Sequence, residues 1–270
     1  MPFEKINNLQ IYYEVHGEGE VVIFLHHGFG CTRIWENVYP EFVKKGFKVV
    51  MYDRRGYGRS ERGHDFQEFY ESDQYRQKSV EELKVIKDLL NIKECHLVGQ
   101  CEGGVIGIDY SIKYPQEIKT LTVASTQCYS DVPMTELNIE KFGKRFKDLE
   151  IEIQAKMIKW HGESAEINYN QFAKYGGAYG VDYFDLRPIL SDVACHVLIL
   201  YPDRSSIFNV EQAVVFYRHL GRGELAVFPK CGHNTYEQRP EDYVSTVLNF
   251  IKRNTQGEDS KVYTVMTCLA

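Results

Sequence analysis

The sequence reads His96-Leu97-Val98-Gly99-Gln100-Cys101-Glu102-Gly103-Gly104 at the point that decides its fold. An apolar run leads into a turn between glycines, and the pattern beyond the turn predicts a helix. A Gly-x-nucleophile-x-Gly pentapeptide is typical of the strained strand-to-helix turn that exposes a nucleophile above a sheet. Here a cysteine, Cys101, stands at the nucleophile position. The alternative interpretation is a glycine-rich turn that holds a buried structural cysteine.

Strand and helix patterns alternate on both sides of this turn. Short, continuous apolar runs are typical of strands that are buried on both faces of a sheet. Strands that alternate with helices favour parallel pairing. We therefore expect an α/β fold with a mostly parallel eight-stranded sheet and helices on both faces. The predicted strands are two antiparallel strands within 3–15, then 21–25, 47–52, the run before Gly99, 118–124, 195–201 and 224–228.

The alternation stops between residues 128 and 190. Helical patterns such as 139–157 follow one another without an intervening strand, and the segment is rich in glycine, tyrosine and phenylalanine. We expect a cap inserted at 128–190 over a core formed by 1–127 and 191–270. Residues 260–270 include an extended run, for which an edge strand, a packed tail and a disordered end are equally open.

Composition and charge exclude several classes of function. The formal net charge is -6 and there are no basic blocks, which argues against nucleic acid or an anionic membrane surface as the main partner. The seven scattered cysteines include no CxxC pair, so we expect no metal site and a reducing, cytoplasmic compartment. The opening residues do not resemble a signal peptide, and no apolar run approaches 18 residues. We expect no cofactor and a small, hydrophobic molecule as the partner; a homodimer stays open.

Four motifs in order resemble the α/β-hydrolase fold. His27-Gly28-Phe29-Gly30 is similar to the HGxG loop of that family, and residues 53–60 are similar to its DxRGxGxS loop. Residues 99–103 resemble its nucleophile elbow, and Cys231-Gly232-His233 resembles the segment with the late catalytic histidine. The resemblance covers residues from about 5 to 253. A cysteine in the elbow is similar to dienelactone hydrolases and polyhydroxyalkanoate synthases, whereas the rest resembles capped esterases, C–C hydrolases and haloperoxidase-like enzymes.

The resemblance implies a role for each motif. Cys101 is the expected nucleophile and His233 the expected base, because a helix N-terminus and an imidazole together favour a thiolate. The backbone N–H groups of Phe29 and Glu102 are the expected oxyanion-hole donors. The Glu102 side chain is unusual, because a carboxylate pointing into the pocket raises the pKa of a neighbouring thiol. We expect it to point to solvent or to pair with a basic side chain.

The sequence departs from the family at the acid that orients the histidine. The usual acid position aligns with Ser205, and Asp203 lies two residues earlier. The preferred interpretation is that Asp203 serves through a shifted loop. Two alternatives are Asp131, which follows the strand at 118–124, and a Cys101–His233 dyad in which Ser205 or a water holds the imidazole. A thiol depends less on the acid than a hydroxyl does.

A pocket between sheet and cap is the expected substrate site. Aromatic pockets with few polar groups are ordinary ligand sites, although aromatic clusters serve as core equally often. We expect a hydrolase of small ester, lactone or thioester substrates that works through an acyl-cysteine, with water or another acceptor taking the acyl group. The alternatives are a non-hydrolytic enzyme of this fold acting on a polyketide-like or C–C substrate, and a ligand-binding pseudoenzyme. The expected substrate-binding residues are His27, Gly28, Trp35, Trp160 and Phe208.

Overall fold

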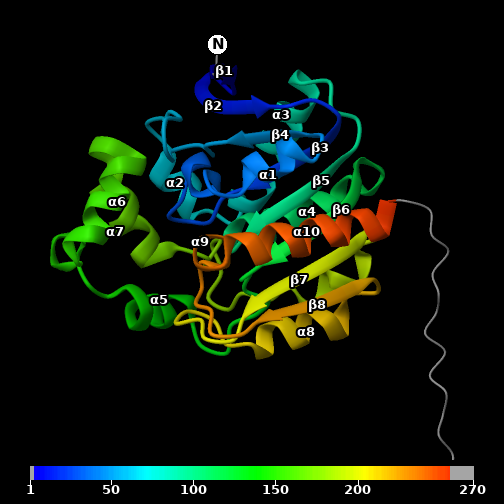
Figure 1. The fold of residues 1–270 in the computed structure, drawn as a ribbon. Coiled ribbons are helices and arrows are strands. Elements are labelled where there is room, and N and C mark those ends of the chain that lie inside the picture. Colours follow the sequence, from blue (N-terminus) through cyan, green and yellow to red (C-terminus); the bar gives the residue numbers. More distant parts are fainter. Residues whose placement is uncertain (1–2, 256–270) are drawn as a thin grey trace, which may run out of the picture.

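Eight strands form one sheet in the order β1-β2-β4-β3-β5-β6-β7-β8 (Figure 1). The computed structural model describes residues 3–255, so the predicted extended run at 260–270 lies outside the described part. Pairing is antiparallel for β1 with β2 and for β2 with β4, and parallel from β4 through β8. The prediction of a mostly parallel eight-stranded sheet is confirmed. The strands are β1 (Phe3–Ile6), β2 (Leu9–His16), β3 (Glu20–Leu25), β4 (Phe47–Tyr52), β5 (Cys95–Gln100), β6 (Ile118–Ala124), β7 (His196–Pro202) and β8 (Gly223–Phe228).

The central strands are buried on both faces, which explains their continuous apolar sequence. Successive side chains of a strand point to opposite faces. In β3, Ile23 therefore packs into one core cluster, whereas Val22 and Phe24 pack into the other. The first cluster contains side chains of α3 (Tyr75–Leu89), α4 (Glu102–Lys113) and α8 (Glu211–His219). The second contains side chains of α1 (Tyr39–Lys44), α9 (Thr235–Gln238) and α10 (Pro240–Thr255).

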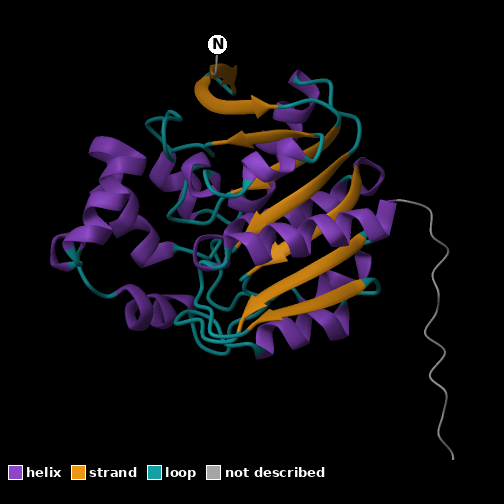
Figure 2. Cartoon of the chain, viewed as in Figure 1, coloured by secondary structure: helices purple, strands orange, loops and turns teal. Residues whose placement is uncertain are grey.

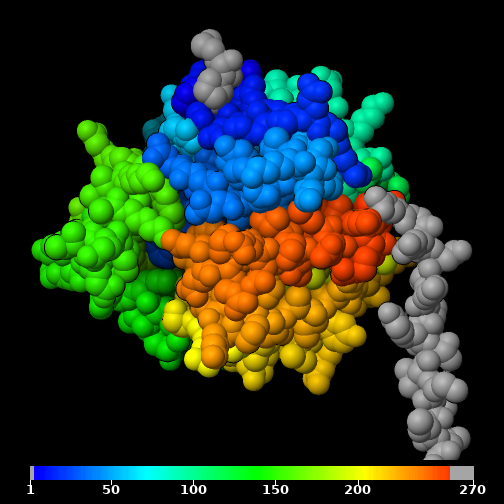
Figure 3. Space-filling view, in the orientation of Figure 1, coloured from blue at the N-terminus to red at the C-terminus, as the bar shows by residue number. Residues whose placement is uncertain are grey.

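The segment between β6 and β7 stands beyond the carboxyl ends of the parallel strands. It contains α5 (Met134–Phe142), α6 (Ile151–His161) and α7 (Ala165–Tyr175), which Figure 2 shows beside the tips of the strand arrows. Figure 3 shows the same segment as a green lobe next to the blue and orange surface of the core. Ligands of parallel α/β sheets bind at this edge. The remaining elements are α2 (Phe66–Glu71) and the 3-10 turns at Thr32–Trp35, Pro115–Glu117, Phe146–Asp148, Gly162–Ser164 and Arg187–Asp192.

None of the helices within residues 3–255 is both long and apolar enough to cross a membrane.

Candidate active site

Cys101 lies on a strained turn between β5 and α4. Its backbone has φ 52° and ψ -115°, a region that a residue with a side chain rarely adopts. A Cβ on Gly99 would overlap the Gly103 backbone, and a Cβ on Gly103 would overlap the carbonyl of Leu25. The two glycines therefore let strand and helix approach closely enough to form the turn. The structure at this point has the shape of a nucleophile elbow.

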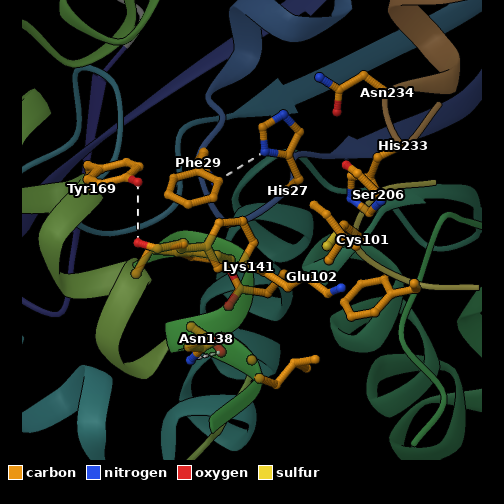
Figure 4. A pocket seen from close by; sticks show the side chains of 18 of the residues that line it. His27, Phe29, Cys101, Glu102, Asn138, Lys141, Tyr169, Ser206, His233 and Asn234 are labelled. Atoms are coloured by element: carbon orange, nitrogen blue, oxygen red, sulfur yellow. Dashed lines mark hydrogen bonds between the residues drawn. The ribbon is translucent and has the colours of Figure 1, made fainter. Parts of the chain in front are cut away.

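A cavity of about 940 Å³ lies between the strand ends and the helices α5, α6 and α7 (Figure 4). Cys101 and His233 both line it, and the Cys101 side chain is partly exposed. Its walls also include four of the residues that the sequence singles out as substrate-binding, namely His27, Gly28, Trp160 and Phe208.

Trp35 does not line this cavity, which corrects the expectation for that residue. Its side chain is 0% exposed and packs against Phe24, Tyr236 and Tyr243 in the core beneath α10. The tryptophan follows the HGxG loop closely in sequence, but the intervening 3-10 turn directs it into the core on the α10 face of the sheet.

The loop that carries His233 is fastened to the two central strands. The His233 carbonyl accepts hydrogen bonds from Gln100 Nε2 at 3.0 Å, from Ser125 Oγ at 2.8 Å and from the Thr235 amide at 3.1 Å. Gln100 precedes the nucleophile and Ser125 follows β6, so these residues set the position of the histidine. Sequence reasoning missed both, because a side chain that binds a distant carbonyl leaves no local pattern.

Ser205, and not Asp203, lies against the ring of His233. Ser205 Oγ is 3.2 Å from His233 Nδ1. Asp203 Oδ1 instead accepts the Cys231 amide at 3.0 Å, and this bond is the main reason that the pKa of Asp203 is lowered. Asp203 therefore fastens the turn after β8, which corrects its expected role as the orienting acid. Asp131 is exposed, and no hydrogen bond joins it to His233 within residues 3–255.

Burial keeps both candidate catalytic groups neutral. It raises the pKa of the Cys101 thiol to about 12, and the nearby Glu102 carboxylate adds to this effect. The Glu102 backbone N–H and the Arg54 charge act in the opposite direction. Burial also lowers the pKa of His233 to about 4. Near pH 7 the pair is therefore a thiol and a neutral imidazole, and no hydrogen bond joins the two side chains in the described part of the chain.

Glu102 forms a buried ion pair with Arg54, which is the second of its two expected surroundings. The distance from Arg54 Nη1 to Glu102 Oε2 is 2.6 Å, and the two side chains are 3% and 2% exposed. The hydroxyl of Tyr75 donates to the same carboxylate oxygen at 3.2 Å. Arg54 also donates to the carbonyls of His26 and His27 at 3.1 and 3.2 Å. The pair thus links the nucleophile helix to the HGxG loop.

The two expected oxyanion donors, the backbone amides of Phe29 and Glu102, differ in whether they already donate a hydrogen bond to another group. The Glu102 N–H lies at the start of α4, directly after Cys101, and it lowers the pKa of the Cys101 thiol. The Phe29 N–H is directed to His27 Nδ1 at 3.1 Å. The other nitrogen of that ring, Nε2, then donates to the Tyr236 hydroxyl at 3.0 Å. Phe29 must therefore release this bond before its amide can hold an oxyanion.

His161 joins α6 to two loops at the strand ends, a role that its sequence context did not reveal. Its Nδ1 accepts the Gly58 amide at 2.9 Å, and its Nε2 therefore donates to the Phe29 carbonyl at 2.8 Å. One buried histidine of α6 thus holds the DxRGxGxS loop and the HGxG loop together. The sequence around His161 gives no sign of this role, because both partners are backbone groups far along the chain.

No group of three or more His, Cys, Asp or Glu side chains within residues 3–255 is arranged to hold a metal ion.

The comparisons with known proteins agree with this geometry. The model of the alpha/beta hydrolase fold matches residues 20–150. A 2-hydroxy-6-oxononadienedioate/2-hydroxy-6-oxononatrienedioate hydrolase of Comamonas testosteroni is 21% identical, over 91% of this chain and 92% of the relative. A proline iminopeptidase of Lactobacillus helveticus (strain DPC 4571) is 31% identical, over 57% of this chain and 50% of the relative.

Solved structures show the same fold. The enol-lactonase from Burkholderia xenovorans LB400 has a TM-score of 0.74 at 15% identity, and the match covers 93% of this chain and all of that one (100%). An esterase from Exiguobacterium antarcticum has a TM-score of 0.75 at 18% identity, with 93% and 98% covered. The strand order, the strained elbow and these matches lead to one conclusion: the chain has the α/β-hydrolase fold.

Proposed function

We propose that the protein is a hydrolase of small, largely apolar ester, lactone or thioester substrates, with an acyl group carried on Cys101. The observation that supports this most is the position of Cys101. It stands on the strained elbow, at the wall of a cavity that it shares with His233. A structural cysteine has no need of a strained backbone that turns its thiol toward a cavity.

The first half of the reaction is acyl transfer to sulfur. The Cys101 thiol gives its proton to His233 Nε2 while the sulfur attacks the substrate carbonyl carbon. The carbonyl oxygen gains the negative charge, and the Glu102 N–H at the start of α4 stabilises it, joined by the Phe29 N–H once that amide leaves His27. The carbon–oxygen or carbon–sulfur bond then breaks, and the leaving group takes the proton from His233.

The second half regenerates the thiol. A water gives a proton to His233 and attacks the acyl carbon, and the same amide groups hold the oxyanion again. The carbon–sulfur bond breaks, the acid leaves and the proton returns to sulfur. An acceptor other than water would turn the same site into an acyltransferase.

The cavity walls fit a substrate with a sizeable apolar part. Phe29 and Phe172 pack against each other with ring centroids 3.9 Å apart, and both line the cavity. Trp160 of α6 and Phe208 after β7 complete the aromatic lining. Because Trp160 and Phe172 belong to the segment 128–190, we propose that this segment acts as a cap that shapes the substrate site on the core of 1–127 and 191–255.

The experiment is hydrolysis of p-nitrophenyl esters of increasing acyl length by the wild type, Cys101→Ala, Cys101→Ser and a matched control, Cys195→Ala. Cys195 lies just before β7, outside the cavity. The proposal predicts that Cys101→Ala abolishes turnover and that Cys195→Ala retains it. Turnover that persists in Cys101→Ala contradicts an acyl-cysteine.

A second candidate is hydrolysis of a C–C bond without an acyl-cysteine. Three curated relatives support this candidate, and each matches 91% or 92% of this chain. Two are named 2-hydroxy-6-oxo-6-phenylhexa-2,4-dienoate hydrolase, and the third is the 2-hydroxy-6-oxononadienedioate/2-hydroxy-6-oxononatrienedioate hydrolase. This candidate predicts product from such a vinylogous 1,5-diketone with little loss in Cys101→Ser. A large loss in that variant supports the thiol route instead.

A further inference from the structure

Ser205 makes three polar contacts through a single atom. Its Oγ lies 3.2 Å from the Ile207 amide, 3.1 Å from the Phe208 amide and 3.2 Å from His233 Nδ1. Both amides can only donate. A hydroxyl oxygen has two lone pairs and one hydrogen. The two amides therefore occupy both lone pairs of Ser205 Oγ.

Within residues 3–255, the hydroxyl hydrogen of Ser205 then has one polar neighbour left to receive it, which is His233 Nδ1. A nitrogen of neutral imidazole that accepts a hydrogen bond carries no proton, so the ring proton must be on the other nitrogen. We propose that Ser205 is a positioning residue that holds His233 in the Nε2–H tautomer. The ring thereby presents a hydrogen-bond donor, and not a base, toward the cavity and Cys101.

The usual acid at this position has the opposite effect. A carboxylate can only accept, so it takes the Nδ1–H and leaves a lone pair on Nε2, which can then receive the nucleophile's proton. In this chain the carboxylate nearest in sequence, Asp203, is engaged by the Cys231 amide and does not reach the ring. The serine thus reverses the direction of the hydrogen bond at Nδ1.

The surroundings of His233 agree with this assignment. Burial lowers the pKa of His233, so the ring is neutral near pH 7 and carries one proton on one of its two nitrogens. The Cys101 thiol is also protonated under these conditions. Both side chains line the cavity, and no hydrogen bond joins them within residues 3–255.

The consequence for catalysis rests on the proposed function. Before His233 can accept the thiol proton, the ring proton must move from Nε2 to Nδ1. Ser205 must at the same time give up one amide bond in order to accept it. The resting site is therefore held away from the tautomer that attacks, and acylation is slower than a carboxylate at position 205 would allow.

The tautomer is measured directly by ¹⁵N NMR of the imidazole nitrogens in uniformly labelled protein at pH 7. The spectrum of His233→Gln identifies the resonances that belong to this ring. We expect an unprotonated Nδ1 and a protonated Nε2 in the wild type and in Ser205→Thr, which keeps the hydroxyl. We expect the reverse in Ser205→Asp, whose carboxylate can accept Nδ1–H and both amides together. A protonated Nδ1 in the wild type overturns the inference.

A single-turnover assay with p-nitrophenyl acetate gives the kinetic readout. Ser205→Asp should raise the acylation rate by about tenfold or more at pH 7, because it restores a general base. Ser245→Asp adds the same charge at an exposed site of α10 and should leave the rate unchanged. Should Ser205→Asp fail to fold, Ser205→Ala replaces it, and its His233 ring should populate both tautomers. An unchanged rate in a folded Ser205→Asp with reversed tautomer contradicts the catalytic consequence.

The two proposals fail separately. The NMR experiment examines resting protein without substrate, so its result holds whether or not Cys101 is acylated. Loss of the acyl-cysteine mechanism would show instead as turnover that survives in Cys101→Ala.

Discussion

Replacing Arg54 by Met should be among the most destabilising single changes in the core. The Arg54 side chain is 3% exposed, and the partners of its guanidinium include Glu102 Oε2, the Tyr75 hydroxyl and the carbonyls of His26 and His27. Met fills much of the volume but leaves the Glu102 carboxylate buried with one remaining donor, Tyr75. Its other oxygen, Oε1, already has no hydrogen-bond partner among the described residues.

The magnitude follows from this unpaired carboxylate. Removing one member of a buried ion pair lowers the free energy of unfolding by about 3–5 kcal/mol. Arg54→Met also leaves two carbonyls of the HGxG loop without this donor, so we expect it to lower the free energy of unfolding by about 4 kcal/mol. With a urea m-value of about 3 kcal/mol/M, the unfolding midpoint should fall by more than about 1 M. Urea unfolding followed by tryptophan fluorescence measures this shift.

The matched control is the double variant Arg54→Met/Glu102→Met. It removes both charges together, and replacing a complete buried pair by apolar side chains is often neutral or stabilising. The double variant still lacks the donor to the two HGxG-loop carbonyls, so it should recover most of the loss and unfold within about 2 kcal/mol of the wild type. A double variant as unstable as Arg54→Met would refute the assignment of the cost to the unpaired carboxylate, as would a single variant with the wild-type midpoint.

Three further changes test other parts of the structure. Burial raises the pKa of Glu82 to about 7, so between pH 4.5 and about 7 the folded state binds a proton that the unfolded state has lost. The melting temperature should therefore fall as the pH rises through this range, and Glu82→Gln should remove this pH dependence. The Glu102 carboxylate adds to burial in raising the pKa of the Cys101 thiol, so Glu102→Gln should speed alkylation of Cys101 by iodoacetamide at pH 8, by about tenfold for each unit by which the thiol pKa falls. An unchanged rate would show that the carboxylate does not act on the thiol. Gly28→Ala should lower the free energy of unfolding by about 1–3 kcal/mol, because the added Cβ overlaps the Phe172 ring. If this overlap is the cause, adding Phe172→Leu to the same chain should recover part of the loss.

The sheet and the elbow were predictable because their signals are local. An apolar run such as Val21–Leu25 indicates a buried strand whatever its neighbours are, and it forms the greater part of β3. The glycines around Cys101 are required by backbone approach within a few residues. The order of these signals along the chain was sufficient to fix a mostly parallel sheet with helices on both faces.

The polar side of the site was less predictable, because its contacts join distant parts of the chain. Whether Asp203 or Ser205 reaches His233 depends on how the turn after β7 meets the turn after β8, and the Cys231 amide decides it. The ion pair of Arg54 with Glu102 spans 48 positions, and His161 reaches Phe29 across 132. Trp35 gave an aromatic signal in the sequence, which does not distinguish a pocket wall from a core.

The acyl-cysteine mechanism is tested most directly by the covalent state of Cys101 during turnover. The protein is mixed with p-nitrophenyl acetate, quenched with acid within the first turnover, digested and analysed by mass spectrometry. An acyl-cysteine mechanism predicts one acetyl group on the peptide that contains Cys101. This acetyl group should be absent from Cys101→Ala and should be lost when the reaction is left to run out. Release of p-nitrophenol at the wild-type rate, with that peptide unmodified throughout or with Cys101→Ala equally active, would contradict it.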